Sequence, residues 1–292
     1  MSVLYPILSE RNVHSRDKHL AFDEPLHKYT ILNDLASNYT SVTKWNHSHF
    51  PSFDTDKVIS NIMRGKKWKS DPTYLYYKKS ANEIKDMWAN NGSAAAGAGT
   101  NLHFDIECFM NQYIVDEDDG PYKYDHELLL EKYEEDLTDG TPCPNESIEW
   151  KYFLDFAQST KHFVPYRTEW MIYDEELKLA GSIDMVYENP DGTLSIYDWK
   201  RSKDISKVNN YNESATTKCI EYVPNSNYWH YSLQLNTYKA ILEKNYGKKV
   251  TDLYLVRLHP NNKNDTYELI KCADLQEEVA TLFDLRKKEI HV

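Results

Sequence analysis

The pattern of hydrophobic and polar positions is clearest in the second half of the chain. Some segments have apolar residues at helical spacing, others alternate apolar with polar residues, and turn residues separate them. The pattern predicts, in order, a helix at 148–161, a strand at 166–173, a hairpin at 181–200, a helix at 229–245, a strand at 252–259 and a closing helix from Asp274. This order favours a mixed sheet flanked by helices, in an α/β or α+β fold.

The first half of the chain has weaker signals. "FDEPLHKYTIL" alternates like a short strand, "YTSVTKW" repeats this signal, and residues 54–92 are predicted as helices that break near "SDP". A further helix is expected to follow "GSAAAGAGT", with Thr100 as its N-cap. We expect an N-terminal helical and β extension at 1–92 that packs on a core at 93–292, and an acidic, helical and mobile surface excursion at 114–147.

Composition excludes several classes of protein. No run of about 18 uninterrupted apolar residues occurs, and Glu10 and Asp17 lie where a signal peptide would be uncharged. We therefore expect a soluble, intracellular protein without a membrane partner. The cysteines stand far apart, at Cys108, Cys143, Cys219 and Cys272. Because they form no CxxC pair, we expect no zinc ribbon, iron–sulfur cluster or disulfide framework.

A net charge of −12 argues against binding of nucleic acid by the whole surface, so a nucleic-acid contact must be local. Two short basic segments could provide one: "RGKKWK" at 64–69 and "KRSK" at 200–203. The candidate nucleic-acid contacts in them are Lys66, Lys67, Trp68, Arg201 and Lys203. The alternative for such segments is a solvated helix face or loop.

The hairpin at 181–200 contains the most specific chemical signal. Its turn, "NPDG", combines a proline that fixes φ with a glycine that can adopt the left-handed conformation. A three-residue loop of this kind pairs Asn189 with Thr193. This register predicts that Asp184 lies directly across from Asp198.

Two carboxylates at such a distance repel each other unless a cation lies between them. Because strand side chains alternate, Lys200 lies on the same face as Asp198. Apolar neighbours indicate a central strand, in which unpaired charges are costly. The pattern therefore favours a divalent cation held by Asp184 and Asp198, with Lys200 beside it. An exposed hairpin with scattered charges is the alternative.

Four segments in this order, "GTNLH", "GSIDMV", "YDWK" and "QLNTY", resemble the motifs of the PD-(D/E)XK nuclease superfamily, specifically its RecB-like exonuclease branch. This branch includes mitochondrial genome maintenance exonucleases and many viral and phage nucleases. The similar segments span about residues 99–238. The resemblance implies the PD-(D/E)XK core fold, and it is compatible with a viral or phage protein that acts in its host cell.

The resemblance also implies roles for individual residues. It makes His103, Asp184 and Asp198 metal ligands, and it makes Lys200 the catalytic lysine. In such a site the metal activates a water molecule, and the lysine orients that water, helps to deprotonate it or stabilises the transition state. The two aspartates are therefore expected to serve catalysis as well as metal binding.

Five further residues follow from the same resemblance. Gln234 and Tyr238 match a QxxxY element whose side chains face the active site and the substrate backbone. Trp199 is expected to lend its backbone carbonyl to the metal. Glu107, one helical turn after His103, and Glu169, on the strand before the hairpin, are additional candidate ligands, with an ordinary surface role as the alternative.

The resemblance implies a cofactor of one or two Mg²⁺ or Mn²⁺ ions, and no iron–sulfur cluster, because the cysteines that hold one in part of this branch are absent. The expected activity is hydrolysis of phosphodiester bonds by an exonuclease on DNA with single-stranded ends, in DNA repair, recombination or replication. RNA is a further candidate substrate. The alternatives are an endonuclease on the same core, structure-specific or RNA-cleaving, a catalytically silent nucleic-acid-binding module, and an interaction domain in which the acidic insert is the functional part.

Overall fold

The computed structural model of the chain describes residues 7–112, 126–209 and 211–290. The chain divides into two compact units. The sheet unit comprises Met1–Pro51 and Leu102–Val292, and the helical unit comprises Ser52–Asn101. The first 51 residues therefore belong to the unit that contains the sheet, whereas the sequence places them in an extension at 1–92.

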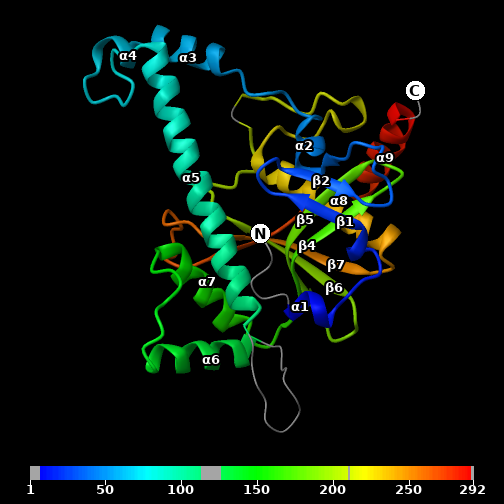
Figure 1. Cartoon of the computed structure of the whole chain (residues 1–292). Helices are drawn as coiled ribbons and strands as arrows, with labels where there is room; N and C mark the ends of the chain where they lie inside the picture. Colours follow the sequence, from blue (N-terminus) through cyan, green and yellow to red (C-terminus); the bar gives the residue numbers. More distant parts are fainter. Residues whose placement is uncertain (1–6, 113–125, 210, 291–292) are drawn as a thin grey trace. The chain divides into compact units, whose positions relative to one another are not determined.

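A mixed sheet of six described strands forms the centre of the sheet unit (Figure 1). The strands are β3 (Thr40–Ser41), β4 (Val164–Asp174), β5 (Leu179–Glu188), β6 (Leu194–Lys200), β7 (Val250–Arg257) and β8 (Glu268–Lys271). β4, β5 and β6 are successive antiparallel neighbours, β6 and β7 are parallel, and β7 and β8 are antiparallel. The sequence predicts the four long strands, and its strand signal in "YTSVTKW" includes β3, but it does not predict β8, because so short a strand carries no periodic signal.

Helices bury an apolar cluster on each face of this sheet (Figure 1). On one face these are α2 (Val42–His47), α8 (Asn227–Asn245) and α9 (Gln276–Ile290); on the other they are α6 (His126–Thr138), α7 (Ile148–Ser159) and the end of α5 (Ala81–Met110). Along β6, Ile196 joins the first cluster and Tyr197 and Trp199 join the second. Since side chains alternate, Asp198 and Lys200 belong to the α8 side. The arrangement confirms the predicted mixed α/β fold.

The turn between β5 and β6 has the predicted form. Asn189 N donates to Thr193 O at 2.8 Å, and Gly192 has a φ of 78°, the left-handed conformation that a glycine adopts without strain. The observed pairs, such as Met185 with Tyr197, confirm the predicted register. The turn residues therefore determine which side chains of β5 and β6 meet.

The N-terminal segment contributes more structure than its sequence predicts. After α1 (Ile7–Arg11) and a 3-10 turn at Asp17–His19, "FDEPLHKYTIL" forms not one strand but the hairpin of β1 (Leu20–Asp23) and β2 (Lys28–Ile31). "YTSVTKW" is extended only at β3 and then forms α2. The strand prediction is wrong for α2 because the Ser41 side chain accepts a hydrogen bond from Lys44 N at 3.2 Å and thus caps a helix.

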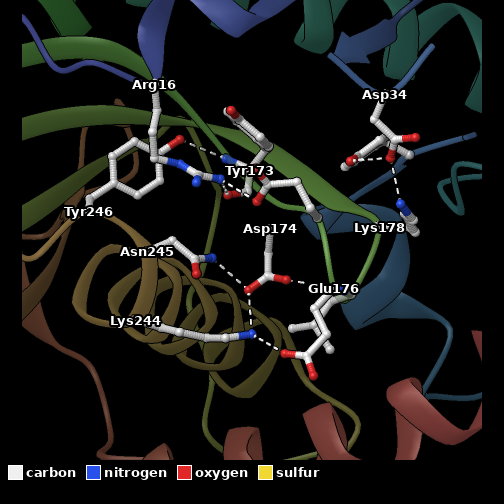
Figure 2. Close-up of polar contacts among 12 residues, drawn as sticks. Arg16, Asp34, Tyr173, Asp174, Glu176, Lys178, Lys244, Asn245 and Tyr246 are labelled. Carbon is white, nitrogen blue, oxygen red and sulfur yellow. Dashed lines mark hydrogen bonds and ion pairs between the residues drawn. The ribbon is translucent and has the colours of Figure 1, made fainter. Parts of the chain in front are cut away.

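A polar network anchors this N-terminal segment beside the turn between β4 and β5 (Figure 2). The buried Asp174 carboxylate accepts hydrogen bonds from Lys244 Nζ at 2.9 Å and Asn245 Nδ2 at 2.6 Å. Arg16 donates to the Tyr173 carbonyl oxygen at 3.1 Å, and its guanidinium lies 4.1 Å from the Tyr173 ring centroid. These contacts join the N-terminal segment and the end of α8 to the end of β4, the strand that carries Glu169.

The helical unit consists of α3 (Thr55–Arg64), α4 (Lys66–Ser70) and most of α5. The predicted break after Ser70 is confirmed. The prediction that a helix starts at Thr100 is wrong, since α5 runs without interruption from Ala81. Alanine has the highest helix propensity, so the alanines of "GSAAAGAGT" continue the helix rather than ending it. No helix among the described residues is long and apolar enough to cross a membrane.

The acidic insert lies only partly within the described residues. Residues 113–125 fall outside them, and the remainder contains α6, which confirms a helix in this segment. Leu129, Leu130 and Tyr133 of α6 are buried in the same apolar cluster as α7. The interpretation of α6 as part of a loose surface excursion is therefore wrong, because an apolar stripe within the acidic sequence packs on the core.

Candidate active site

Three acidic side chains lie level with one another on three neighbouring strands. β4 pairs Thr168 with Met185 and Trp170 with Ile183, which places Glu169 opposite Asp184. The β5–β6 register places Asp184 level with Asp198, as predicted. The ladder between β5 and β6 nevertheless begins only at Met185, so no ladder pair of the described residues joins the two aspartates. Before Met185, the described residues of β5 and β6 are therefore unpaired with each other, and we call this unpaired stretch the opening between β5 and β6. The candidate site lies there.

Glu169 has an unusual backbone conformation for a strand residue. Its φ is 41°, in the left-handed region that bulky residues rarely adopt. Its carboxylate accepts a hydrogen bond from Ser182 Oγ at 2.9 Å, on the neighbouring strand β5. Backbone strain of this kind persists where surrounding structure enforces it, and it concentrates at functional sites. The strained backbone aims the carboxylate toward Asp184.

Asp198 and Lys200 form a close ion pair at the end of β6. The Asp198 side chain is 3% exposed, and its Oδ2 has no hydrogen bond of regular geometry to the described residues. The Lys200 ammonium also lies 4.7 Å from the ring centroid of Tyr231 on α8. A buried carboxylate is costly unless it is paired with a cation. The Lys200 ammonium, which contacts Asp198 Oδ2, therefore compensates the buried negative charge.

His103, on the part of α5 that belongs to the sheet unit, reaches this opening. Its Nε2 lies 3.0 Å from the Trp199 carbonyl oxygen, and because a carbonyl can only accept, Nε2 must be the donor. In the neutral ring, Nδ1 then carries the free lone pair, and it faces Asp184 Oδ2 at 3.5 Å and Glu169 Oε1 at 3.9 Å. The hydrogen bond to Trp199 thus sets the tautomer that binds metals.

The opening between β5 and β6 is stabilised by Asp184 itself. Trp199 N donates to Asp184 Oδ2 at 3.0 Å, which satisfies a backbone group that the ladder leaves unpaired. The Trp199 carbonyl accepts from His103, and its second lone pair remains available for a cation. The predicted role of this carbonyl as a metal ligand stays a prediction, whereas its role in orienting His103 is an observed contact.

The donor set fits a divalent metal ion. One ligand atom each of His103, Glu169 and Asp184 can be chosen so that all lie within 4.8 Å of one another. Asp198, which the register places level with Asp184, adds a further carboxylate that is paired with Lys200. Carboxylate oxygens with one imidazole suit Mg²⁺ and, even better, Mn²⁺. Glu169 therefore belongs to the cluster that the structure brings together.

The crowding of acids changes their protonation. Burial and the Asp184 charge raise the pKa of Glu169 to about 8, and the same two causes raise the pKa of Asp198 to about 6. Burial disfavours the charged form of Lys200, but the Asp198 and Asp184 carboxylates outweigh this and raise the pKa of Lys200 above its ordinary value. Strongly raised pKa values within one cluster are typical of functional sites.

Glu107, the other acid predicted on α5, lies beside this cluster rather than in it. It lines a cavity of about 110 Å³ together with Glu169, Arg167 and Asp17. Burial raises the pKa of Glu107, and its charge contributes to the raised pKa of Glu169. The structure thus assigns Glu107 an electrostatic influence on the site, and its role as a ligand stays a prediction.

Gln234 and Tyr238, four residues apart on α8, form a pair next to β5. Gln234 Nε2 donates to the Tyr238 hydroxyl at 3.0 Å and to Thr43 Oγ1 at 3.2 Å. The buried ring of Tyr238 lies against Gly181, where a Cβ atom would come within 2.8 Å of Tyr238 Cε1. The glycine of "GSIDMV" and the tyrosine of "QLNTY" are therefore complementary in shape.

Replacing Gly181 with alanine is expected to destabilise the chain by about 1–3 kcal/mol, because the added methyl group overpacks against Tyr238. Urea denaturation measures the change. The same substitution at Gly97 in α5, where a Cβ meets nothing within 4 Å, is expected to stabilise by about 0.5–1 kcal/mol. In a Tyr238→Leu background Gly181→Ala should cost less; an equal cost there would contradict the steric explanation.

Sequence reasoning missed three residues around the site: Tyr29 of β2, Ser182 of β5 and Tyr231 of α8. Burial, followed by the Glu169 and Asp184 charges, raises the pKa of Tyr29 to about 12, so this ring lies near the acids. "HKYTI" was a usable signal for Tyr29. Ser182 and Tyr231 had none, because their importance depends on contacts with Glu169 and Lys200 that only the fold creates.

The predicted nucleic-acid contacts lie apart in the sequence and differ in their surroundings. Lys66 and Lys67 are exposed on α4, whereas the half-buried Trp68 donates its indole N–H to Lys79 O at 2.9 Å. Arg201 donates to Glu149 at 2.8 Å, and Lys203 is exposed. Trp68 and Arg201 thus have structural contacts, and all five nucleic-acid roles stay predictions.

A family model for the PD-(D/E)XK nuclease superfamily matches residues 127–291, which is more than half of the chain and includes Asp184, Asp198 and Lys200. The fold and the row of acids beside a lysine define a nuclease core, and the chain belongs to the PD-(D/E)XK nuclease superfamily. The predicted superfamily is thereby confirmed. Nucleases of this superfamily generally use divalent ions such as Mg²⁺ or Mn²⁺.

Among solved structures, the chain is similar to a protein from Eubacterium rectale described as a "putative exonuclease". The two sequences are 14% identical, the match covers 87% of this chain and 82% of the other, and the TM-score is 0.31. No curated protein matches the sequence significantly.

Proposed function

We propose that this chain is a divalent-metal-dependent deoxyribonuclease of the RecB-like branch that shortens DNA from single-stranded ends. The observation that carries the proposal is the row of Glu169, Asp184 and Asp198, closed by His103 on one side and Lys200 on the other. The four quoted motifs of the branch meet here. "GTNLH" supplies His103, "GSIDMV" and "YDWK" supply the aspartates and lysine, and "QLNTY" packs on the glycine.

In this proposal His103 Nδ1 and the carboxylates of Glu169, Asp184 and Asp198 hold the divalent ion. When bound, such an ion lowers the pKa of a water molecule and neutralises the charge that develops on the phosphate. The protein fixes the ligands in advance: the Trp199 carbonyl orients His103, Trp199 N holds Asp184, and Ser182 holds Glu169. Prior positioning of this kind is a main source of catalysis.

Lys200 has a distinct role in the proposed reaction. Its raised pKa keeps the ammonium charged at neutral pH. A charged ammonium donates hydrogen bonds, so Lys200 would orient the attacking water and stabilise the extra negative charge of the transition state. The face of the Tyr231 ring, 4.7 Å away, helps to hold the ammonium in place through a cation–π contact.

The charge distribution supports a nucleic-acid substrate. The helical unit contains eight Lys and Arg against five Asp and Glu, a net charge of +3 in a chain of net −12. Lys66 and Lys67 are exposed within it and are the proposed contacts to the phosphate backbone. Because the positive charge is concentrated in this unit, DNA binding should depend on a few local contacts. Such contacts favour single-stranded ends over long duplexes as substrates.

The test is cleavage of end-labelled single-stranded DNA, linear or as a closed circle, in Mg²⁺, in Mn²⁺ and in EDTA. We expect the linear strand to be shortened only when a divalent ion is present, while the circle stays intact. Cutting of the circle would instead support an endonuclease on the same core. Binding of DNA without cleavage of DNA or RNA would support a catalytically silent module and would overturn the proposal.

A further inference from the structure

We propose that Thr43 and His47 of α2 bind the phosphodiester backbone of the substrate strand next to the bond that is cut. The inference rests on the proposed nuclease function and extends it to a segment, "YTSVTKW", that lies outside the matched family range.

The position of α2 follows from β3. Thr40 and Ser41 pair in parallel with Leu179 and Ala180 of β5, so the N-cap Ser41 lies level with Ala180 and α2 begins at the next residue, level with Gly181. At Gly181–Asp184 the same strand has no ladder pair to β6 in the described chain. The first turn of α2 therefore lies beside the open stretch of β5 that ends in Asp184.

The exposed face of α2 points away from the core. Val42, Trp45 and Asn46 are buried, whereas Thr43, Lys44 and His47 are exposed. Thr43 and His47 are four residues apart and share one side of the helix. Each of them meets a polar side chain of α8, Gln234 in one case and His230 in the other. One hydrogen bond and one ring contact thus connect α2 to the helix that carries Gln234 and Tyr238.

The contacts of Gln234 leave Thr43 as the available donor. Both amide hydrogens of Gln234 are engaged, one with the Tyr238 hydroxyl and one with Thr43 Oγ1. Gln234 therefore has no N–H left for a substrate phosphate. Thr43 accepts that bond, so its own O–H is free to donate outward from an exposed position. Gln234 thus acts as a positioning residue, and Thr43 presents the hydroxyl to the substrate.

His47 lies near the reacting end of the site. Its ring centroid is 5.2 Å from that of His230, which in turn lies 4.2 Å from the Phe50 ring. The Lys200 charge is close enough to add to the effect of burial, and together they lower the pKa of His47. A neutral imidazole keeps one N–H donor. His47 thus offers a second donor near the catalytic lysine, one helical turn from Thr43.

Donors of this kind fix the register of a strand. Hydroxyl and imidazole groups hydrogen-bond to phosphate oxygens and position nucleic acid without reading its sequence. Thr43 and His47 should therefore hold the linkage beside the scissile one, so that the scissile phosphate lies at Asp198 and Lys200. Their loss should weaken substrate binding far more than it slows the chemical step.

The test compares Thr43→Val and His47→Phe with wild type on linear single-stranded DNA in Mg²⁺. Valine keeps the shape of threonine, and phenylalanine keeps the ring against His230. We expect each variant to raise KM about 10- to 100-fold, as expected for loss of one hydrogen bond to a charged group, with kcat within about twofold. Thr281→Val and His162→Phe, exposed residues of α9 and of the segment after α7, are matched controls that should leave both constants unchanged.

A second measurement does not depend on the folding of variants. In this measurement one phosphate of the DNA strand at a time is replaced by a neutral methylphosphonate. Wild type should bind less tightly when the linkage beside the cut is neutral. The two variants, which already lack the contact to this linkage, should show no further loss of affinity. A fall in kcat at unchanged KM, wild-type behaviour of both variants, or an equal methylphosphonate effect in all three proteins would overturn the inference. If wild type cleaves no nucleic acid, the proposed function fails and this inference fails with it.

Discussion

Replacing Lys200 with methionine is expected to lower kcat for DNA cleavage by about 100- to 1000-fold, with a much smaller change in KM. Methionine keeps the length and apolar stem of lysine but removes the charge, and a preorganised charge in a buried site commonly contributes this much to a transition state. The Lys200 ammonium is the charged partner of Asp198 and lies against Tyr231. No other residue of the described chain is paired with Asp198 in an ion pair that could replace it.

The matched control for this variant is Lys203→Met. Lys203 is an exposed lysine three residues further along the chain, so its loss should change KM by less than about tenfold and kcat little. Circular dichroism of both variants checks that the fold is retained. Equal activities of Lys200→Met and wild type would contradict the catalytic role, whereas equal losses in both variants would indicate a general charge effect.

Replacing Glu169 with glutamine is expected to make the metal-free protein more stable at pH 8 but not at pH 5. Burial and the Asp184 charge raise the pKa of Glu169 from 4.5 to about 8. Between these values the folded state binds a proton that the unfolded state lacks, so this group's contribution to stability is complete below pH 4.5 and is lost as the pH rises to about 8. Glutamine does not titrate and avoids the loss.

Thermal denaturation in EDTA measures this effect as the difference in Tm between variant and wild type. The difference should grow by several degrees from pH 5 to pH 8, and Glu134→Gln, an exposed residue of α6, should show no such growth. Saturating Mn²⁺ should reverse the order at pH 8, because the metal binds the carboxylate in place of the proton. A pH-independent difference would mean that Glu169 is an ordinary surface carboxylate.

The parts of the site that the sequence predicted are those that depend on short-range rules. A proline and a glycine in "NPDG" determined a three-residue turn, and the turn placed Asp184 level with Asp198. Alternation along β6 then placed Lys200 on the same side. These features follow from local backbone geometry, which is encoded within a few residues.

Other features depend on contacts between distant segments, and they escaped prediction for that reason. The φ of Glu169 is set by the strands around it, not by its own sequence neighbours. The opening of the β5–β6 ladder is maintained by the Asp184 side chain and the Trp199 N–H together. The pairing of Thr43 with Gln234 joins residues that are 191 positions apart.

Some predictions failed because two local rules competed. "YTSVTKW" has strand propensity, yet the Ser41 cap and the tertiary contacts of Val42 and Trp45 favour a helix. The small residues before Thr100 suggested a boundary, yet alanine propensity carries α5 through them. In the first case a helix cap and tertiary contacts outweighed strand propensity, and in the second helix propensity outweighed the boundary signal.

The most direct test of the central claim is the single-turnover rate of cleavage of end-labelled single-stranded DNA, titrated with Mn²⁺, for wild type and Asp184→Asn. The claim is that the acids of β4, β5 and β6 hold a divalent metal ion and that Lys200 acts beside this ion in catalysis. It predicts no cleavage in EDTA, saturation of the wild-type rate with Mn²⁺, and a requirement for at least about tenfold more Mn²⁺ in the variant. Cleavage in EDTA, or an identical Mn²⁺ dependence in the two proteins, would contradict it.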